Sequence, residues 1–475
     1  MTTIYGYQAL RPHQEAVLKP FLQGRDTLAI IPTGGGKSLC YIVPAMMGEG
    51  LGVVISPLIS LIRDQVIKLR SFGVPAASMD SMQTYAEKNQ VIRGLQQSWI
   101  KILFISPERL ANKDFRSFLG TRKMRFLAVD EAHCVSEWGS DFRPEYRKLG
   151  LYFADLPQDI PRLALTATAT TKVRHDISHN LKLREPAEII RTPIRDNLEI
   201  EAKQLKANTD HIQQILAKLP SSTNQGIIYT FSRKNSTLIA RLLQQKGVSS
   251  ASYHAGLSAK EREHTLHRFL TSDVAVVVAT NAFGLGIDKK DIRFVHHYGL
   301  PPTLESYIQQ IGRAGRDGMK SRCCLFFQKR DADTHRYLWE QNYPKPQRIK
   351  RAYEILRYLH DQHPEKSYVL YQDFILEYQG YNEASEKDMA RLIAILLKED
   401  LIEQVTRGDH RVRQETQKTA EAIRLKANEQ DMVNFLHHYH DRKQEAAKKI
   451  DAMETYAISG DKGDQVIRRY FDSPI

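Results

Sequence analysis

The chain has 475 residues, enough for about three domains at the usual one hundred to two hundred residues each. Its formal net charge of +13 comes from residues 1–350, which carry 49 Lys and Arg against 32 Asp and Glu, and this basic excess suits a polyanionic partner. The four cysteines include no C-x-x-C pair, which argues against a structural zinc site, and free thiols fit a reducing cytosol. The lack of a signal peptide or a span-length apolar run predicts a cytoplasmic protein with no membrane contact.

A glycine-rich run follows the apolar segment 28–31, which we expect to be a strand. Its members are Thr33, Gly34, Gly35, Gly36, Lys37 and Ser38. Glycines let backbone N–H groups turn toward phosphate oxygens, and Lys37 adds a positive charge for the β- and γ-phosphates. Ser38 supplies a hydroxyl for Mg²⁺. The strict motif has glycine where this chain has Ile31, so we interpret the run as a relaxed P-loop, with an ordinary Gly-rich turn as the alternative.

Short apolar runs followed by polar loops recur along the first part of the chain, at 53–55, 102–105, 126–129 and 163–165. With helical stretches between them, they predict a parallel sheet that binds ligands at the carboxyl ends of its strands. The third run ends in Asp130 and Glu131. Phosphate-bond hydrolysis needs one carboxylate to hold Mg²⁺, which suits Asp130, and another to orient the attacking water, which suits Glu131. The alternative is an ordinary solvated acidic loop.

An aromatic-rich segment, residues 134–146, comes directly after the acid pair. Trp138 and Phe142 offer ring faces on which bases can stack, and Arg143 adds a cation nearby. A core position for the two rings is the alternative, but residues 139–141 (Gly-Ser-Asp) interrupt any amphipathic period. The interruption favours a surface role for the rings.

With these motifs, residues 1–330 resemble superfamily 2 helicases, and specifically the RecQ family of DNA helicases, as a shorter bacterial-type member without the zinc-binding cysteines. The resemblance implies an α/β fold of two tandem RecA-like parallel-sheet lobes, residues 1–196 and 197–340. It also implies that the aromatic-rich segment touches single-stranded DNA and couples that contact to ATP hydrolysis. Ser140 stands where the family usually has histidine.

Segment 7–14 resembles the family's adenine-recognition segment, with His13 in place of the usual glycine. The resemblance places Tyr7, Arg11 and Gln14 at ATP. Tyr7 would stack on the adenine ring, and Gln14 would read the edge of the base through its amide. Because guanine presents a different edge, the segment favours ATP.

Other short runs also match family motifs. Residues 56–58 (Ser-Pro-Leu) match a loop that grips the nucleic-acid backbone, and residues 166–168 (Thr-Ala-Thr) match the motif that transmits nucleotide state between lobes. Residues 195–197 (Arg-Asp-Asn) fall near the join between the lobes. Residues 283–288 resemble the motif that links DNA to the nucleotide.

Two arginines close the second lobe's set of motifs. Arg313 and Arg316 lie three residues apart and would point together from one helical turn. By resemblance they are arginine fingers that stabilise charge on the transferred phosphoryl group, and Gln309 joins them; the planar guanidinium matches phosphate geometry. Solvated surface arginines are the alternative, but glycines at 312, 315 and 318 argue for close approach to another group.

The last third of the chain carries weaker signals. Residues 341–413 are expected to form a winged helix with helices at 349–359 and 386–397 and a strand at 401–405. An ordinary helical bundle remains the alternative. Residues 414–475 are expected to be a helical, charged tail.

Together the resemblance implies an ATP- and Mg²⁺-dependent DNA helicase that moves 3′ to 5′ and serves recombination and repair. Its partners would be single-stranded and duplex DNA, with single-strand-binding or recombination proteins as candidates, and no zinc is expected. Two other classes stay open. An RNA helicase of superfamily 2 should lack the aromatic-rich segment, and a DNA-binding scaffold without unwinding activity should lack the acid pair or the arginines.

Overall fold

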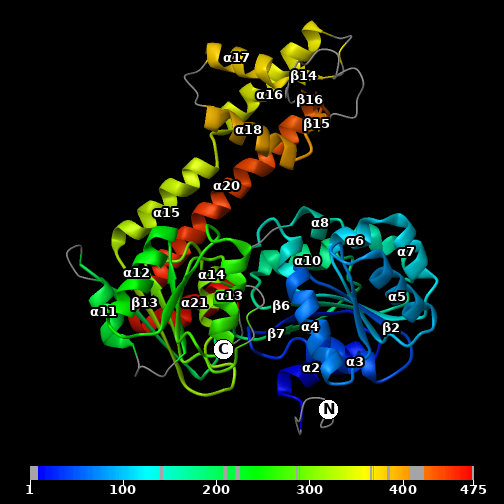
Figure 1. Cartoon of the computed structure of the whole chain (residues 1–475). Helices are drawn as coiled ribbons and strands as arrows, with labels where there is room; N and C mark the ends of the chain where they lie inside the picture. The colour runs from blue at the N-terminus through cyan, green and yellow to red at the C-terminus, as the bar shows by residue number, and fades with distance from the viewer. Residues whose placement is uncertain are drawn as a thin grey trace. The chain divides into compact units, whose positions relative to one another are not determined.

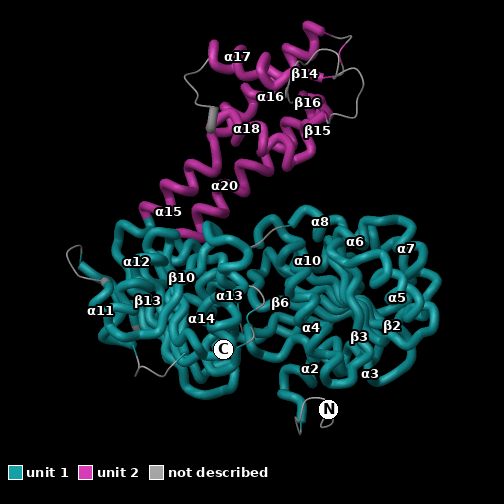
Figure 2. Tube along the Cα trace, in the orientation of Figure 1, with its two compact units in different colours: residues 1–332, 451–475 teal, residues 333–450 magenta. Residues whose placement is uncertain are grey.

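The computed structural model describes residues 9–139, 143–206, 211–219, 225–284, 287, 289–363, 366, 368–381, 386–405 and 422–472. Two expected site residues, Tyr7 and Phe142, lie outside these ranges, as do three positions of the motif expected at 283–288 (285, 286 and 288). The chain divides into two compact units, residues 1–332 with 451–475, and residues 333–450 (Figure 2). Each unit is described by itself.

The first lobe of the larger unit, coloured blue to cyan in Figure 1, is built on a seven-stranded sheet. All of its strands are parallel, and their order is β3-β4-β2-β5-β6-β1-β7. Its strands are β1 (Thr27–Ile30), β2 (Leu51–Ile55), β3 (Ala76–Met79), β4 (Ile102–Ile105), β5 (Met124–Val129), β6 (Arg162–Thr166) and β7 (Ala187–Ile190). Alternate residues of β2 enter different apolar clusters, Val53 and Ile55 one and Val54 the other, so both faces of the sheet are covered. This double burial explains why the strands appear in the sequence as continuous apolar runs.

Helices and short 3₁₀ turns connect these strands. They are α2 (Pro12–Leu22), α3 (Leu39–Met46), α4 (Ile59–Ser71), α5 (Tyr85–Gln96), α6 (Pro107–Ala111), α7 (Lys113–Gly120), η1 (Ala132–Val135), α8 (Pro144–Arg147), α9 (Leu149–Tyr152), η2 (Phe153–Asp155) and α10 (Thr171–Asn180). Because β2, β5, β6 and β1 are neighbours and parallel, the loops after them meet at one edge of the sheet. The P-loop, the acid pair and residues 166–168 all lie at that edge.

The second lobe has a six-stranded sheet, also parallel, with the order β10-β11-β9-β12-β13-β8. Its strands are β8 (Leu198–Gln204), β9 (Gly226–Thr230), β10 (Ser250–Tyr253), β11 (Val276–Ala279), β12 (Phe294–Tyr298) and β13 (Ser321–Phe327). Its helices are α11 (His211–Lys218), α12 (Arg233–Gln245), α13 (Ala259–Leu270) and α14 (Leu304–Ile311). Two parallel-sheet lobes in tandem confirm the expected fold class.

The end of the chain belongs to this second lobe. The expected charged tail contains η3 (Gly460–Lys462) and α21 (Gly463–Phe471), and five of its apolar residues join the buried core under the second sheet: Met453, Tyr456, Ala457, Ile467 and Phe471. These residues recur at helical spacing, which a high content of charged residues concealed in the sequence.

The smaller unit has its own apolar core and a three-stranded antiparallel sheet with the order β14-β16-β15. Its elements are α16 (Pro346–Gln362), β14 (Val369–Leu370), α17 (Tyr371–Tyr381), α18 (Glu386–Lys398), β15 (Ile402–Val405) and β16 (Ala422–Leu425). The chain passes between the units within α15 (Lys329–Asn342) and α20 (Glu429–Ile458). The helices expected at 349–359 and 386–397 fall within α16 and α18. The expected limit at 413 stays a prediction, although β16 lies beyond it and completes this sheet. Within the part of the chain that the structure describes, no helix combines the length and apolar character that a membrane crossing needs.

Candidate functional site

The P-loop runs from β1 into the first turn of α3, and side chains from the start of α2 hold its backbone. Gly34 and Gly36 have φ of +80°, the left-handed region that favours glycine. Arg11 donates to the Gly34 carbonyl at 3.1 Å, and a ring nitrogen of His13 lies 2.7 Å from the carbonyl oxygen of Gly35. The loop is therefore fixed from one side before any phosphate arrives, with Thr33, Lys37 and Ser38 in the same run.

Gln14 is buried against this loop. Its amide nitrogen donates to the Gly36 carbonyl at 3.1 Å and to that of Gly35 at 3.3 Å, and its oxygen accepts from the Arg11 N–H at 2.9 Å. The expected contact with an adenine edge would require the amide to leave these partners, so the adenine role stays a prediction. In the structure, Gln14 supports the P-loop.

The acid pair follows β5 and faces Lys37. Burial raises the pKa of Asp130 well above the usual carboxyl range, the neighbouring Glu131 raises it further, and the Lys37 ammonium opposes both. The Lys37 ammonium donates to the Ile31 carbonyl at 3.5 Å, a long and therefore weak hydrogen bond. Glu131 has φ of +47°, a strained value for a side-chain-bearing residue that is typical of functional loops. A cation and phosphate oxygens would fit among these groups.

The residues present fit a bound Mg²⁺–nucleotide. Among the described residues, no group of three or more His, Cys, Asp or Glu could hold a metal alone. Mg²⁺ commonly takes one or two protein oxygens and completes its octahedron with phosphates and water. Ser38 in the P-loop after β1 and Asp130 directly after β5 offer such a pair of oxygens, because β1 and β5 flank β6 in the parallel sheet and their carboxyl ends lie at the same edge.

His133, which sequence reasoning did not assign, connects the acid pair to β6. Its Nδ1 lies 2.8 Å from the Thr166 hydroxyl and 3.4 Å from the Glu131 carboxylate. Thr166 in turn donates to the Thr168 carbonyl at 3.3 Å. The signal that the sequence offered was the position of His133, two residues after Glu131. In the structure, the short turn η1 brings its ring back to the edge of the sheet.

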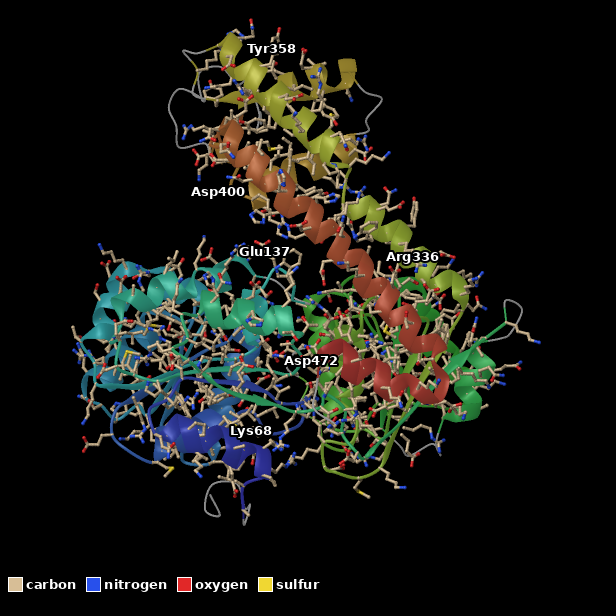
Figure 3. The ribbon with its side chains drawn as sticks, turned by 180° about the vertical axis from the view of Figure 1, so that it is seen from behind. Lys68, Glu137, Arg336, Tyr358, Asp400 and Asp472 are labelled. Carbon is tan, nitrogen blue, oxygen red and sulfur yellow. The ribbon has the colours of Figure 1, made fainter. Side chains whose placement is uncertain are left out.

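The aromatic-rich segment rests on α10. Trp138 is half-buried against the core of the first lobe, and the Lys172 ammonium lies 3.2 Å from its ring centroid. Ser136 donates to Asp176 at 2.7 Å, and Glu137, labelled in Figure 3, pairs with Arg147. The ring therefore combines the two alternatives, a core contact and a surface position.

Arg143, expected at DNA, donates to the Pro57 carbonyl at 2.8 Å. This bond ties the aromatic-rich segment to the loop after β2, one of the runs expected to grip a nucleic-acid backbone. The structure thus brings two expected DNA-contacting segments together.

The two arginines lie in the turn that follows α14, so the expectation that they share one helical turn is wrong. Helix α14 ends at Ile311, and Gly315 in the following turn has φ of +57°. Arg313 is buried beside Gly284, while Arg316 donates to the Ile287 carbonyl at 2.7 Å. Gln309 occupies the last helical turn and is partly buried.

Arg195 and Asn197 hold this turn in place, a role that the sequence did not reveal. Arg195 donates to the carbonyls of Gly315 at 2.7 Å and Gly312 at 3.0 Å, and also to that of Ala314. Asn197 donates to the Gly315 carbonyl at 2.8 Å. The two side chains fix the turn that carries both arginines.

The same turn approaches the P-loop. A Cβ atom built on Gly34 would lie 3.1 Å from Cγ of Arg316 and 3.6 Å from the guanidinium carbon of Arg195. One built on Gly312 would lie 2.8 Å from Cβ of Thr33. Within the larger unit, the P-loop of the first lobe therefore lies close to the turn of the second lobe that carries Arg313 and Arg316.

Comparison with known families matches both lobes. Residues 11–177 match the family described as DEAD/DEAH box helicase, and residues 207–318 match the helicase conserved C-terminal domain. A solved structure of the helicase MrfA with DNA and AMPPNP shares the fold, with a TM-score of 0.55 at 20% identity over 69% of this chain and 50% of that chain.

Two curated relatives carry the same helicase name. "ATP-dependent DNA helicase RecQ" of Pasteurella multocida is 42% identical over 74% of this chain and 55% of its own length, so the chain spans little more than half of that relative. The protein of the same name from Synechocystis is 40% identical over 67% of this chain and 68% of its own length. With both helicase domains matched in order, the chain belongs to the RecQ family of ATP-dependent DNA helicases.

Proposed function

We propose that this protein unwinds duplex DNA in the 3′ to 5′ direction at the expense of ATP, and that it serves recombination and repair. The observation that carries the proposal is the approach of the arginine turn, residues 312–316, to the P-loop. A nucleotide bound there would touch both lobes, so its binding and hydrolysis would shift the equilibrium between lobe arrangements. Family membership supports DNA as the polymer that moves.

The first lobe would supply most of the hydrolytic groups. Lys37 would bind the β- and γ-phosphates, and Ser38 and Asp130 would hold Mg²⁺, which neutralises phosphate charge. Glu131 would orient the attacking water, and its buried Oε2 accepts no hydrogen bond among the described residues. Residues Thr33 to Gly36 would surround the phosphates with backbone N–H groups.

The second lobe would supply positive charge at the transferred phosphoryl group. The aliphatic part of Arg316 lies near the P-loop and its guanidinium donates to the Ile287 carbonyl, so we expect this guanidinium to turn toward a phosphate oxygen when a nucleotide binds. Arg313 and Gln309 would complete this group of side chains, and Arg195 would keep the turn in position. Guanidinium groups placed in this way stabilise the charge that develops in phosphoryl transfer.

DNA would contact the first lobe through Trp138, Phe142 and Arg143, with Trp138 offering a ring face to a base. The smaller unit would act as a winged helix that binds duplex DNA. Its order of elements, α16-β14-α17-α18-β15-β16 with β16 central in the sheet, supports this assignment.

We also propose the metal content, the cellular compartment and the protein partners of this chain. All four cysteines are buried and none forms a disulfide bond, which supports a protein that folds without zinc in a reducing cytoplasm. Single-strand-binding and recombination proteins are its proposed partners. Metal analysis of protein purified without added metal should find no stoichiometric zinc.

The deciding experiment is an unwinding assay with the purified full chain. DNA duplexes with a 3′ tail, a 5′ tail or no tail, and an RNA duplex, are compared with and without ATP and Mg²⁺. We expect unwinding of the 3′-tailed DNA alone. Preferential unwinding of the RNA duplex would move the protein to the RNA helicases, and DNA binding without unwinding or ATP turnover would support a scaffold.

A further inference from the structure

The last helix of the chain, α21, contacts both lobes of the larger unit. Its buried side chains Ile467 and Phe471 belong to the core of the second lobe. Directly after the helix, Asp472 (labelled in Figure 3) lies against α10 of the first lobe, where its carboxylate accepts from the Thr171 hydroxyl at 3.2 Å. Residues 463–472, named the C-terminal strap from here on, therefore bridge the two lobes.

Arg174 on α10 is the centre of this bridge. It is 6% exposed, and its guanidinium donates to the Phe471 carbonyl at 3.1 Å and to the Asp472 carboxylate at 3.4 Å. The same group donates within the first lobe to the Ala169 carbonyl at 3.4 Å and to the Thr171 hydroxyl at 3.0 Å. A buried charge is costly unless it is hydrogen-bonded. Because two of these acceptors lie on the strap, movement of the strap away from α10 would cost free energy.

The strap also contacts the helix that leads into the arginine turn. The Tyr470 hydroxyl donates to the carboxylate of Glu305, a buried residue of α14, at 3.0 Å. Just before the strap, the Tyr456 hydroxyl donates to that of Tyr307, also on α14, at 3.3 Å, and the two rings are 5.2 Å apart. Helix α14 ends directly before the arginine turn. The strap therefore connects α10 of the first lobe to the element that positions this turn.

The arginine turn has its own contacts in this arrangement of the lobes. The Arg316 guanidinium donates to the Ile287 carbonyl of its own lobe. The turn also packs directly on the P-loop, since a Cβ atom built on Gly312 would lie 2.8 Å from Cβ of Thr33. Phosphates that enter the P-loop would displace the turn, and a strap bound to α10 on one side and to α14 on the other would resist that displacement.

We propose that the C-terminal strap is an autoinhibitory contact, which holds the two lobes in this arrangement and restrains ATP hydrolysis until DNA binds. Helix α10 also contacts the aromatic-rich segment, through Lys172 at the Trp138 ring. Further along the same helix, Asp176 accepts from Ser136. DNA bound at that segment would therefore act on the helix that holds the strap. The inference rests on the proposed movement of the lobes and adds an element that restrains it.

The test compares Asp472→Gly with Asp400→Gly in the full chain. Asp472 has φ of +46°, and its side chain is 76% exposed and pairs with Arg174. Asp400 is a close match, with φ of +58° and a side chain that is 78% exposed and pairs with Lys426. Glycine adopts this backbone conformation readily, so each variant loses a side chain without backbone strain. Asp472→Gly should raise the ATPase rate without DNA about twofold to fivefold, the population shift expected from loss of a mostly exposed ion pair. The rate at saturating single-stranded DNA should stay the same, and Asp400→Gly should change neither rate.

A second measurement follows the lobes directly. All four native cysteines are buried, so spin labels can be attached selectively at Gln90→Cys on α5 and Lys260→Cys on α13, two exposed positions in different lobes. Pulsed electron paramagnetic resonance without DNA should show a broader distribution of distances between the labels for Asp472→Gly than for the wild type or Asp400→Gly. Adding Asp472→Gly to Arg174→Ala should raise the DNA-free ATPase rate no further than Arg174→Ala alone, because both changes remove the same contact.

Several outcomes would overturn the inference. An unchanged or lower DNA-free rate in Asp472→Gly, or an unchanged distribution of distances, would show that the strap does not restrain the lobes. Equal rises in the two glycine variants would indicate a general effect of lost surface charge, and additive rises in the double variant would separate the two strap residues. A wild-type protein without ATPase activity at any DNA concentration would contradict the proposed function, while the distances between the labels would still test the strap.

Discussion

Trp138→Ala should weaken the response of the ATPase to single-stranded DNA. One ring face is covered by the Lys172 ammonium, 3.2 Å from the centroid, and part of the ring packs on the core of the first lobe, so at most one face can stack on a base. Stacking contributes roughly 1–3 kcal/mol per base, which corresponds to a rise of about 5-fold to about 150-fold in the half-saturating DNA concentration.

The same substitution also costs stability. Truncating a fully buried large aromatic residue costs about 3–5 kcal/mol, and Trp138 is only half-buried, so about half of that cost is expected. The lost cation–π contact with Lys172 adds about 0.5–1 kcal/mol. A domain of this size should stay folded, and circular dichroism and a melting curve check that it does.

The assay is the ATPase rate against single-strand concentration for the wild type, Trp138→Phe and Trp138→Ala. The phenylalanine variant keeps a smaller ring and should fall between the other two. Trp99→Ala, at a 45% exposed tryptophan elsewhere in the lobe, is the control for loss of a surface ring. If Trp138→Ala shows the wild-type half-saturating concentration and full stimulation, the ring is a packing residue and the stacking argument fails.

Three further predictions follow from the same geometry. Lys37→Ala should abolish ATP hydrolysis and retain DNA binding, with exposed Lys260→Ala as the charge-matched control; loss of both properties in a folded variant would contradict separate sites. Gly36→Ala and Gly24→Ala place alanine at φ of +80° and +85°, and this left-handed backbone should cost each variant about 1 kcal/mol of stability. Only in Gly36→Ala does the new Cβ collide with the buried Gln14 amide, so this variant should lose more stability than Gly24→Ala and should also lose ATPase, as melting curves and turnover rates will show. Burial lowers the pKa of His297 to about 3, so between about pH 6.5 and pH 3 the unfolded chain binds a proton at this residue that the native state lacks, and the contribution of His297 to the unfolding free energy should decrease by about 1.4 kcal/mol for each unit that the pH is lowered. His296, whose pKa is lowered to about 4, adds to the loss in the wild type and in His297→Gln alike; urea titrations at about pH 6 and pH 4.5 should therefore give a smaller loss for His297→Gln, and equal losses would refute the assignment.

The sequence by itself was sufficient for the features that depend on local pattern. The apolar runs at 53–55, 102–105, 126–129 and 163–165 fall within β2, β4, β5 and β6, because strands buried on both faces must be apolar at successive positions. The glycines of the P-loop and the acid pair could be placed at the ends of particular strands, because a short loop stays close to the strand that it follows. Family membership follows from these motifs and from their order.

Only the tertiary structure decided which groups those side chains meet. Gln14 and Arg143 were expected at ligands, but their partners are the P-loop carbonyls and the Pro57 carbonyl, which lie 22 and 86 residues away in sequence. Arg195 lacked any sequence signal for its contacts, because it donates to the carbonyls of a turn about 120 residues away in sequence that the fold brings close. Spacing along the chain encodes the period of a helix or a strand, whereas the partner of a hydrogen-bonding side chain is set by how the sheets and helices pack around it.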